Sequence, residues 1–267
     1  MDTKTAIDVF VRAKTAEGLS DQTLASYGYR LKRFGNWFPE SLPAEIPAIE
    51  EFLVDTASTP ENAETYWRLL KNIYGFLNRR ELIDFNPIED IPRPKIPRKI
   101  ARQFTRKELK KILTYENHRD HDRAFLWLLA DTGIRIGEAL SVTEASYEDG
   151  FLHVTGKTGE RIVPVSNQVW ENVRAELPWK WNTRPSASIG VRRAIHAAGV
   201  GGAKASAHTL RHTFCRTWNG DESILVEILG WTSPRMLKVY RPFNKDRAKS
   251  QHDTFSVSKS YQQPYLF

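Results

Sequence analysis

The stretch from Ile91 to Arg102 limits what this chain can fold into more than any other part of the sequence. It contains three prolines, and each proline removes a backbone donor and prevents a helix from continuing through it. Cations alternate with these prolines and follow them, at Arg93, Lys95, Arg98, Lys99 and Arg102. We therefore expect an extended basic linker over residues 91–104, with a separately folded part of the chain on each side of it.

The net charge changes sign at this linker. Residues 1–90 contain 10 Lys and Arg against 15 Asp and Glu, whereas residues 91–267 contain 29 against 17. Excess positive charge favours a polyanionic partner, because neutralising phosphates releases the counterions condensed around them. A basic protein without such a partner is an equally good explanation of the charge alone. Cations spaced between prolines favour the first interpretation, since such a segment can lie along a DNA backbone.

Composition restricts the class of protein further. With 40% hydrophobic residues, the 267-residue chain can form ordinary cores, which excludes disorder over most of its length. The single cysteine, Cys215, excludes an internal disulfide framework and a cysteine-based zinc site, and it fits a reducing compartment. No apolar run is long enough to cross a bilayer, and the first residues lack the apolar core of a signal peptide. We expect a cytoplasmic protein, associated with the nucleoid if it is prokaryotic.

Apolar residues at helical spacing predict a bundle of about four helices before the linker. Ser20 is placed to cap one helix, and Thr59 followed by Pro60 is typical of the start of another. Shorter helices are expected over residues 5–14 and 48–56. The polar faces of the second and last helices carry basic residues, so we expect them to contact DNA, although ordinary solvated faces look similar. The candidate DNA-binding residues of the bundle and linker are Thr23, Arg30, Arg33, Arg68, Lys71, Arg93, Lys95, Arg98 and Lys99.

The part of the chain after the linker, residues 105–245, is expected to combine helices with a small sheet. A capping box at Thr105 predicts a helix start, and a longer apolar helix is expected to end near Gly133. Two segments with alternating apolar residues predict a β-hairpin. They span residues 151–155 and 161–165. The predicted fold class is mainly α with a small β component, in which a helical bundle precedes a mixed α+β domain and residues 246–267 form a tail.

Three segments of this second part combine residue types that suit chemistry on a phosphate. They are Thr132-Gly-Ile-Arg-Ile-Gly-Glu138, His208-Thr-Leu-Arg-His212 and Leu229-Gly-Trp231, the last followed by Tyr240. Phosphoryl transfer needs cations on the non-bridging oxygens, an in-line nucleophile and a proton donor for the leaving oxygen. Arginine suits the first task, because its planar guanidinium binds phosphate oxygens bidentately and remains charged.

In this order and spacing, the segments resemble the catalytic half of the tyrosine recombinase (phage integrase) family, whose pattern also places a lysine in a β-hairpin turn. The helical first part, through Leu19-Ser-Asp-Gln-Thr-Leu-Ala-Ser-Tyr27, is similar to the core-binding, SAM-like domain of that family. The resemblance covers about residues 5–245. It implies six catalytic residues in this chain, which are Arg135, Lys157, His208, Arg211, Trp231 and Tyr240.

The residue types fit these roles. His208 and Arg211 are three residues apart, so on a helix they share one face and can address one phosphate together. His208 is then expected to accept the proton of Tyr240, the nucleophile that forms a 3′-phosphotyrosyl link. Lys157 is expected to protonate the departing 5′ oxygen, although a lysine in a turn is often only solvated. Trp231 can donate its N–H to a phosphate oxygen, or it packs against the helix that bears Tyr240.

Two more residues are expected to support the site without touching the phosphate. Glu138 is placed to anchor neighbouring basic side chains, the alternative being an exposed helix carboxylate. His212 is expected to point away from the phosphate. Because a phosphotyrosyl link conserves the energy of the broken bond, rejoining requires neither ATP nor a metal, and no cofactor is expected.

The resemblance implies a site-specific recombinase that acts on double-stranded DNA with inverted core-type half-sites. It also implies a dimer on each site and a tetramer in the synapse, with strand exchange through a Holliday junction and the C-terminal tail packed on a neighbouring protomer. Two alternatives remain open at this point. A type IB topoisomerase would relax a plasmid without any special site, and a catalytically inert DNA-binding or excision accessory protein would leave no covalent adduct.

Overall fold

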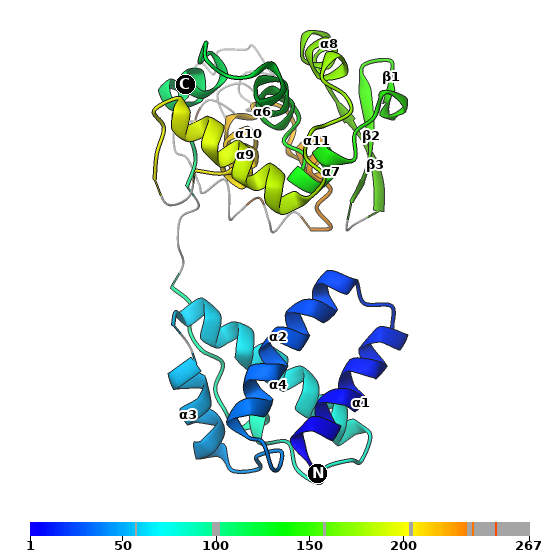
Figure 1. Cartoon of the computed structure of the whole chain (residues 1–267), viewed down its shortest axis with the longest axis vertical. Helices are drawn as coiled ribbons and strands as arrows, with labels where there is room; N and C mark the ends of the chain where they lie inside the picture. The colour runs from blue at the N-terminus through cyan, green and yellow to red at the C-terminus, as the bar shows by residue number, and fades with distance from the viewer. Residues whose placement is uncertain are drawn as a thin grey trace, which may run out of the picture. The chain divides into compact units, whose positions relative to one another are not determined.

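The computed structural model describes residues 1–56, 58–97, 102–156, 159–202 and 205–233, together with Leu237 and Lys249. The chain divides into two compact units, Met1–Lys99 and Ile100–Phe267. The described residues are mainly helical with one small sheet, which confirms the predicted fold class (Figure 1). Four predicted site residues lie outside the described residues, as does the predicted tail apart from Lys249. They are Arg98, Lys99, Lys157 and Tyr240.

Four α-helices and a short 3₁₀ turn make up the described part of the first unit. They are α1 (Thr3–Ala16), α2 (Asp21–Trp37), α3 (Ile46–Thr56), α4 (Pro60–Arg79) and η1 (Pro87–Glu89). Ser20 is the residue before α2, as predicted, but its side chain makes no capping hydrogen bond to the helix. The Thr59 hydroxyl accepts a hydrogen bond from the Asn62 backbone N–H at 3.2 Å, with Pro60 as the first helical residue. The first helix begins two residues earlier than predicted, because the Asp2 carboxylate accepts hydrogen bonds from two backbone N–H groups.

Aromatic side chains from all four helices form the core of the first unit. Phe10, Phe34, Phe52 and Tyr74 come from α1, α2, α3 and α4 in turn, and none is more than 1% exposed. The rings of Phe34 and Phe52 meet edge to face with centroids 5.1 Å apart. The Tyr74 hydroxyl donates to the Pro43 carbonyl at 2.6 Å, so its polar end has a partner within the fold. This cluster determines how the four helices pack.

The first residues of the predicted linker lie against α4. The Trp67 indole N–H donates to the Ile91 carbonyl at 2.9 Å, and Arg93 forms an ion pair with Glu64 at 2.5 Å. The Glu64 side chain is only 5% exposed and also pairs with Arg68 at 3.1 Å. These contacts attach residues 91–93 to the first unit.

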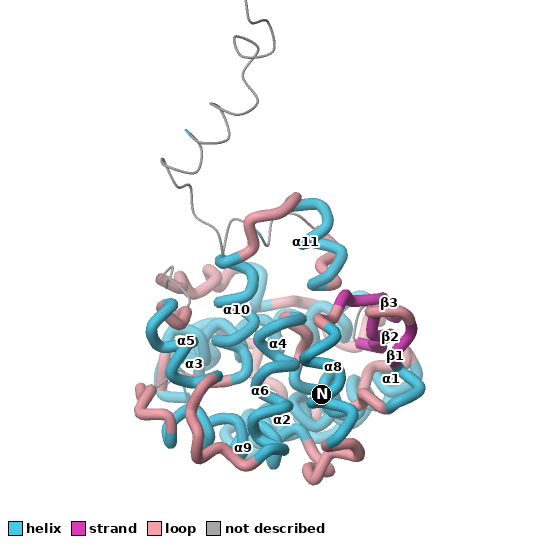
Figure 2. Tube along the Cα trace, turned by 90° about the horizontal axis from the view of Figure 1, so that it is seen from above, coloured by secondary structure: helices cyan, strands magenta, loops and turns pink. Residues whose placement is uncertain are grey.

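The second unit contains the strands and the remaining described helices. In chain order they are α5 (Arg106–Leu113), α6 (Asp120–Thr132), α7 (Ile136–Leu140), η2 (Glu144–Ser146), β1 (Tyr147–Glu148), β2 (Phe151–Gly156), β3 (Gly159–Pro164), α8 (Asn167–Ala175), α9 (Arg184–Ala197), α10 (Ala207–Thr217) and α11 (Glu222–Leu229). Both views show the strands gathered at one edge of this unit (Figures 1 and 2). The capping box predicted at Thr105 is present, with the Glu108 carboxylate accepting from the Thr105 backbone N–H at 2.8 Å.

The sheet is antiparallel in the order β1-β2-β3. Strands β2 and β3 pair from Phe151↔Pro164 to Gly156↔Gly159, so the predicted hairpin is correct. The two-residue strand β1 was not predicted, because two residues are too few to show an alternating pattern. Leu152 and Val154 on β2 face the core, at 0% and 2% exposure.

Helix α6 lies at the centre of the second unit and contacts α5, α7, α8, α9 and α10. Its side chains Phe125, Leu128 and Leu129 are at most 1% exposed. It ends at Gly133, as predicted, because that residue adopts a left-handed backbone (φ 63°) that favours glycine. No helix among the described residues is both long and apolar enough to span a bilayer. Within the same residues, no group of three or more His, Cys, Asp or Glu side chains is placed to hold a metal ion.

Candidate active site

The junction between α6 and α7 places Arg135. Gly133 ends α6, and Arg135 is the N-cap of α7, with an extended backbone (φ −74°, ψ 148°). The Glu138 carboxylate, one turn later, accepts the Arg135 backbone N–H at 2.7 Å and the Arg135 Nη1–H at 2.8 Å. The short helix therefore fixes both the backbone and the guanidinium of Arg135 through one carboxylate.

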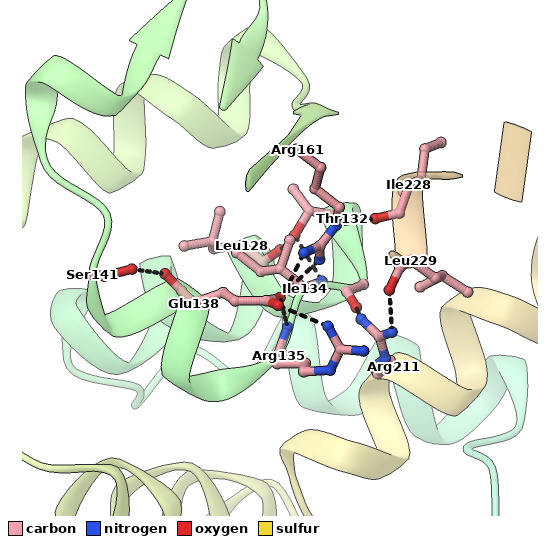
Figure 3. A network of polar contacts seen from close by, with 11 residues as sticks. Leu128, Thr132, Ile134, Arg135, Glu138, Ser141, Arg161, Arg211, Ile228 and Leu229 are labelled. Atoms are coloured by element: carbon pink, nitrogen blue, oxygen red, sulfur yellow. Dashed lines mark hydrogen bonds and ion pairs between the residues drawn. The ribbon is translucent and has the colours of Figure 1, made fainter. Parts of the chain in front are cut away.

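Glu138 is the centre of a larger network (Figure 3). Its side chain is 3% exposed, which rules out the exposed carboxylate considered from the sequence. Arg161 on β3 donates to it through Nη1 at 3.0 Å and Nη2 at 2.8 Å. Burial alone would raise the pKa of Glu138, but the hydrogen bonds from Arg161 and Arg135 outweigh it and lower that pKa to about 2. Glu138 is thus a carboxylate at any physiological pH.

Helix α10 carries Arg211 into the same region. Arg211 is 5% exposed, and it donates through Nη1 to the Gly133 carbonyl at 2.7 Å and through Nη2 to the Leu229 carbonyl at 2.6 Å. Its guanidinium carbon lies 6.0 Å from the centre of the Trp231 ring, a distance compatible with a weak cation–π contact. Trp231 follows Gly230, whose left-handed backbone (φ 59°) ends α11.

Two histidines of α10 lie against each other, with His208 and His212 ring centroids 4.2 Å apart. Burial, followed by the charges of Arg211 and Arg135, lowers the pKa of His208 below the usual 6.5. Burial, followed by His208, lowers the pKa of His212 to about 4. Both imidazoles are therefore neutral near pH 7, and a neutral His208 can accept a proton.

A pocket of about 360 Å³ brings three of the six predicted catalytic residues together, whereas Trp231 is not among its described lining residues and packs instead against a cluster with Leu225 and Leu229. Arg135, His208 and Arg211 all line the pocket, although they come from two helices more than 70 residues apart in the chain. Its remaining lining residues are Ile134, Ile136, Gly137, Glu138, Gly156, Arg184 and Ala207. Three arginines and one histidine therefore line the pocket beside the single carboxylate of Glu138, and this excess of positive charge suits the binding of a phosphate.

Two arginines of this region were not singled out from the sequence. Arg184 opens α9 and lines the pocket, and a helix start gives no sign of which cavity it will face. The sequence did contain a signal that Arg161 faces the interior. Arg161 shares a face of β3 with the fully buried Val163, while Ile162 between them is 55% exposed, and an inward-facing arginine requires a buried partner.

The catalytic roles expected of Lys157 and Tyr240 remain predictions, because both residues lie outside the described part of the chain. The strands on either side of Lys157 end at Gly156 and Gly159, which pair with each other. Gly156 also lines the pocket.

The candidate DNA-binding residues of the first unit lie on α2, on α4 and in the segment after η1. Arg30 on α2 lies 6.0 Å from the Tyr66 ring centre on α4, and Lys71 lies 5.0 Å from that of Trp67. Arg68 and Arg93 share Glu64, while their side chains remain 59% and 62% exposed. Thr23 is half-buried, whereas Arg33 and Lys95 are exposed.

Known proteins are similar to this chain in sequence and in fold. The model of the phage integrase family matches residues 102–247. The tyrosine recombinase XerD of Pseudomonas putida is 28% identical over 92% of this chain and 95% of its own length. XerD of Staphylococcus haemolyticus is 25% identical over 90% of this chain and 94% of its own length. A lambda integrase dimer bound to a COC′ core site has a similar fold, with a TM-score of 0.77 at 19% identity over 92% of this chain and 80% of that one. The recombinase XerH bound to its difH substrate also has a similar fold, with a TM-score of 0.68 at 20% identity over 90% of this chain and 81% of that one.

Proposed function

The chain belongs to the phage integrase family of tyrosine recombinases, and on that premise we propose that it is a site-specific DNA recombinase. It cleaves and rejoins DNA through a 3′-phosphotyrosyl intermediate on Tyr240, without a metal or ATP. The observation that carries this proposal is the pocket in which Arg135, His208 and Arg211 meet.

The two arginines bind the scissile phosphate. Their guanidinium groups neutralise the non-bridging oxygens, on which negative charge accumulates as the transition state forms. Protein groups fix the orientation of both: Glu138 for Arg135, and the carbonyls of Gly133 and Leu229 for Arg211. Fixed cations need no reorganisation during the reaction, which is the main source of electrostatic catalysis.

The strand is broken by an in-line displacement. The Tyr240 oxygen forms a bond to phosphorus and its proton passes to neutral His208, while the bond from phosphorus to the 5′ oxygen breaks and that oxygen takes a proton from Lys157. Trp231 donates its indole N–H to a phosphate oxygen. Rejoining is the reverse, with a 5′ hydroxyl as the nucleophile and Tyr240 as the leaving group.

We assign the remaining DNA contacts to the first unit and the linker. Thr23, Arg30, Arg33, Arg68 and Lys71 bind the backbone from α2 and α4, and Arg93, Lys95, Arg98 and Lys99 bind it from the linker. Two protomers occupy inverted half-sites and two such dimers form the synapse, an assembly supported by the similar fold of a lambda integrase tetramer bound to a Holliday junction. The enzyme acts on DNA in the cytoplasm, at the nucleoid of a prokaryotic host.

A trapping experiment tests this function. A core duplex is first selected from randomised inverted repeats by its affinity for the protein, and a nick is then placed next to each phosphate of its central region in turn. Cleavage beside a nick releases a short strand, so the covalent complex cannot rejoin and accumulates. We expect wild-type protein to form an adduct that survives denaturation, and Tyr240→Phe to form none.

Tyr261→Phe is the matched control, because it removes a hydroxyl from another tyrosine near the C-terminus and should leave the adduct unchanged. Two results would separate the alternatives. Binding without any adduct from wild type would identify an inert DNA-binding protein, and rapid relaxation of a supercoiled plasmid that lacks the selected site would identify a topoisomerase.

A further inference from the structure

Every donor atom of the Arg161 guanidinium has a partner in the second unit. Nε donates to the Ile228 carbonyl at 2.8 Å, Nη1 to Glu138 Oε1 at 3.0 Å and Nη2 to Glu138 Oε2 at 2.8 Å. The side chain is 11% exposed, and Arg161 is not among the described residues that line the catalytic pocket. Its charge is therefore directed at protein groups rather than at the phosphate.

Arg161 and its two partners belong to three segments that each carry a proposed catalytic group. Arg161 itself is four residues beyond Lys157, on the same hairpin. Glu138 holds Arg135 on α7, and Ile228 is in the last turn of α11, three residues before Trp231. Figure 3 shows Arg161 between Glu138 on one side and Ile228 on the other.

The space around the guanidinium is closely filled. A Cβ atom at Gly156 would collide with Glu138 Oε1, and one at Gly230 would come within 3.0 Å of Arg161 Cδ. Glycines at the ends of β2 and α11 thus let the backbone approach the Arg161–Glu138 pair closely. A small displacement of this pair would consequently be transmitted to both segments.

We propose that Arg161 is a positioning residue for strand cleavage, which holds the Arg135 helix, the Lys157 hairpin and the end of α11 in one fixed arrangement. This inference rests on the recombinase function proposed above. It assigns a role to a residue that touches neither the phosphate nor the nucleophile. Lysine cannot replace it, because a single ammonium cannot form a planar bidentate pair with Glu138 and also reach the Ile228 carbonyl.

The proposal has a structural alternative, in which the buried pair only stabilises the fold. The two differ in the step they affect. Loss of stability lowers the amount of folded protein, whereas loss of positioning lowers the cleavage rate of protein that is folded and bound to DNA. A misplacement of the order of 1 Å is enough to slow an enzymatic reaction about 100-fold.

The test compares full-length wild type, Arg161→Gln and Arg161→Lys on the nicked core duplex under single-turnover conditions at saturating protein. Arg174→Gln is the matched control, since Arg174 is 56% exposed on α8 and contacts Glu144 only at 4.0 Å. We expect both Arg161 variants to cleave about 10- to 100-fold more slowly, with DNA dissociation constants within about twofold of wild type and the control unchanged. Rates are expressed per DNA-bound protein, and Arg161→Lys carries the test if Arg161→Gln does not fold.

A double variant examines the route through Glu138. If Arg161 acts through that carboxylate, the double variant Glu138→Gln/Arg161→Gln should cleave only slightly more slowly than the slower of the two single variants. Additive effects, or Arg161 variants that cleave at the wild-type rate once bound, would overturn the inference while leaving the recombinase function intact. Failure of wild type to form any adduct would instead overturn the proposed function, and this inference with it.

Discussion

Two of the five N–H bonds of the Arg211 guanidinium are directed at backbone carbonyls, those of Gly133 and Leu229. Arg135 is oriented in a similar way by the Glu138 carboxylate. The cations proposed to bind the phosphate are therefore held by the protein itself, so little rotational freedom remains to be lost when a phosphate binds. At the scale of single residues, orientation of charge is the main property of this site.

The neutral state of His208 leads to a prediction about pH. Because the pKa of His208 is lowered, its imidazole is still mostly unprotonated when the pH reaches 6.5. It becomes protonated, and is lost as a base, only when the pH falls through that lowered pKa. The second-order rate constant for cleavage, which reports groups of the free enzyme, should therefore remain near its plateau at pH 6.5. Its acid limb should lie below that pH and should disappear in His208→Gln. A limb centred at or above 6.5 in wild type would contradict this assignment.

Lys157 can be tested by changing the leaving group. A DNA strand with sulfur in place of the scissile 5′ oxygen releases a thiolate, which needs no proton because thiols are far more acidic than alcohols. Lys157→Ala should cleave the oxygen substrate at least about 100-fold more slowly than wild type, and cleave the sulfur substrate at nearly the wild-type rate. Lys180→Ala on the oxygen substrate serves as the lysine control. Equal slowing on both substrates would show that Lys157 is not the general acid.

At the scale of elements, the helix ends were the most predictable feature. Thr59, Thr105 and Gly133 each end or begin a helix as predicted, because capping depends on a few adjacent residues. Ser20 marks the start of α2 without a side-chain capping hydrogen bond. The network around Glu138 was less predictable. Its second partner, Arg161, is 23 residues away on a strand, and which strand packs on which helix depends on the whole core rather than on local pattern.

Gly133 gives a prediction about the α6–α7 junction. Alanine there must adopt the left-handed backbone, which costs about 1–2 kcal/mol, and its Cβ would also collide with the Phe214 ring, which adds about 1–3 kcal/mol. Gly199→Ala is the control, since φ is +70° there and no atom lies within 4 Å of the added Cβ. Urea unfolding should show a larger loss of stability for Gly133→Ala, and equal losses would refute the close packing at this junction.

At the scale of the whole molecule, the two halves differ in charge, with a balance of −5 in residues 1–90 and +12 in the rest. The division into Met1–Lys99 and Ile100–Phe267 lies close to this change of sign. One cation of the bundle, Arg68, already pairs with Glu64, as does Arg93 at the start of the linker. We infer that the linker and the second unit supply most of the sequence-independent attraction to DNA.

Two four-charge variants of the full chain test this inference. One replaces Arg93, Lys95, Arg98 and Lys99 with glutamine, and the other replaces Arg30, Arg33, Arg68 and Lys71. Each lost phosphate contact lowers, by about 0.9, the slope with which the logarithm of the DNA-binding constant falls against the logarithm of the salt concentration. The linker variant should therefore lose more of the wild-type slope than the bundle variant. An equal or larger loss in the bundle variant would contradict this inference.

The central claim is that Tyr240 forms the covalent bond to DNA. It is tested most directly by trapping the adduct on the nicked duplex, digesting the DNA with nuclease and the protein with trypsin, and identifying by mass spectrometry the peptide that carries the remaining nucleotide. We predict that the modified residue is Tyr240 and that the nucleotide is attached through its 3′ phosphate. Attachment at another residue, or through a 5′ phosphate, would contradict the account.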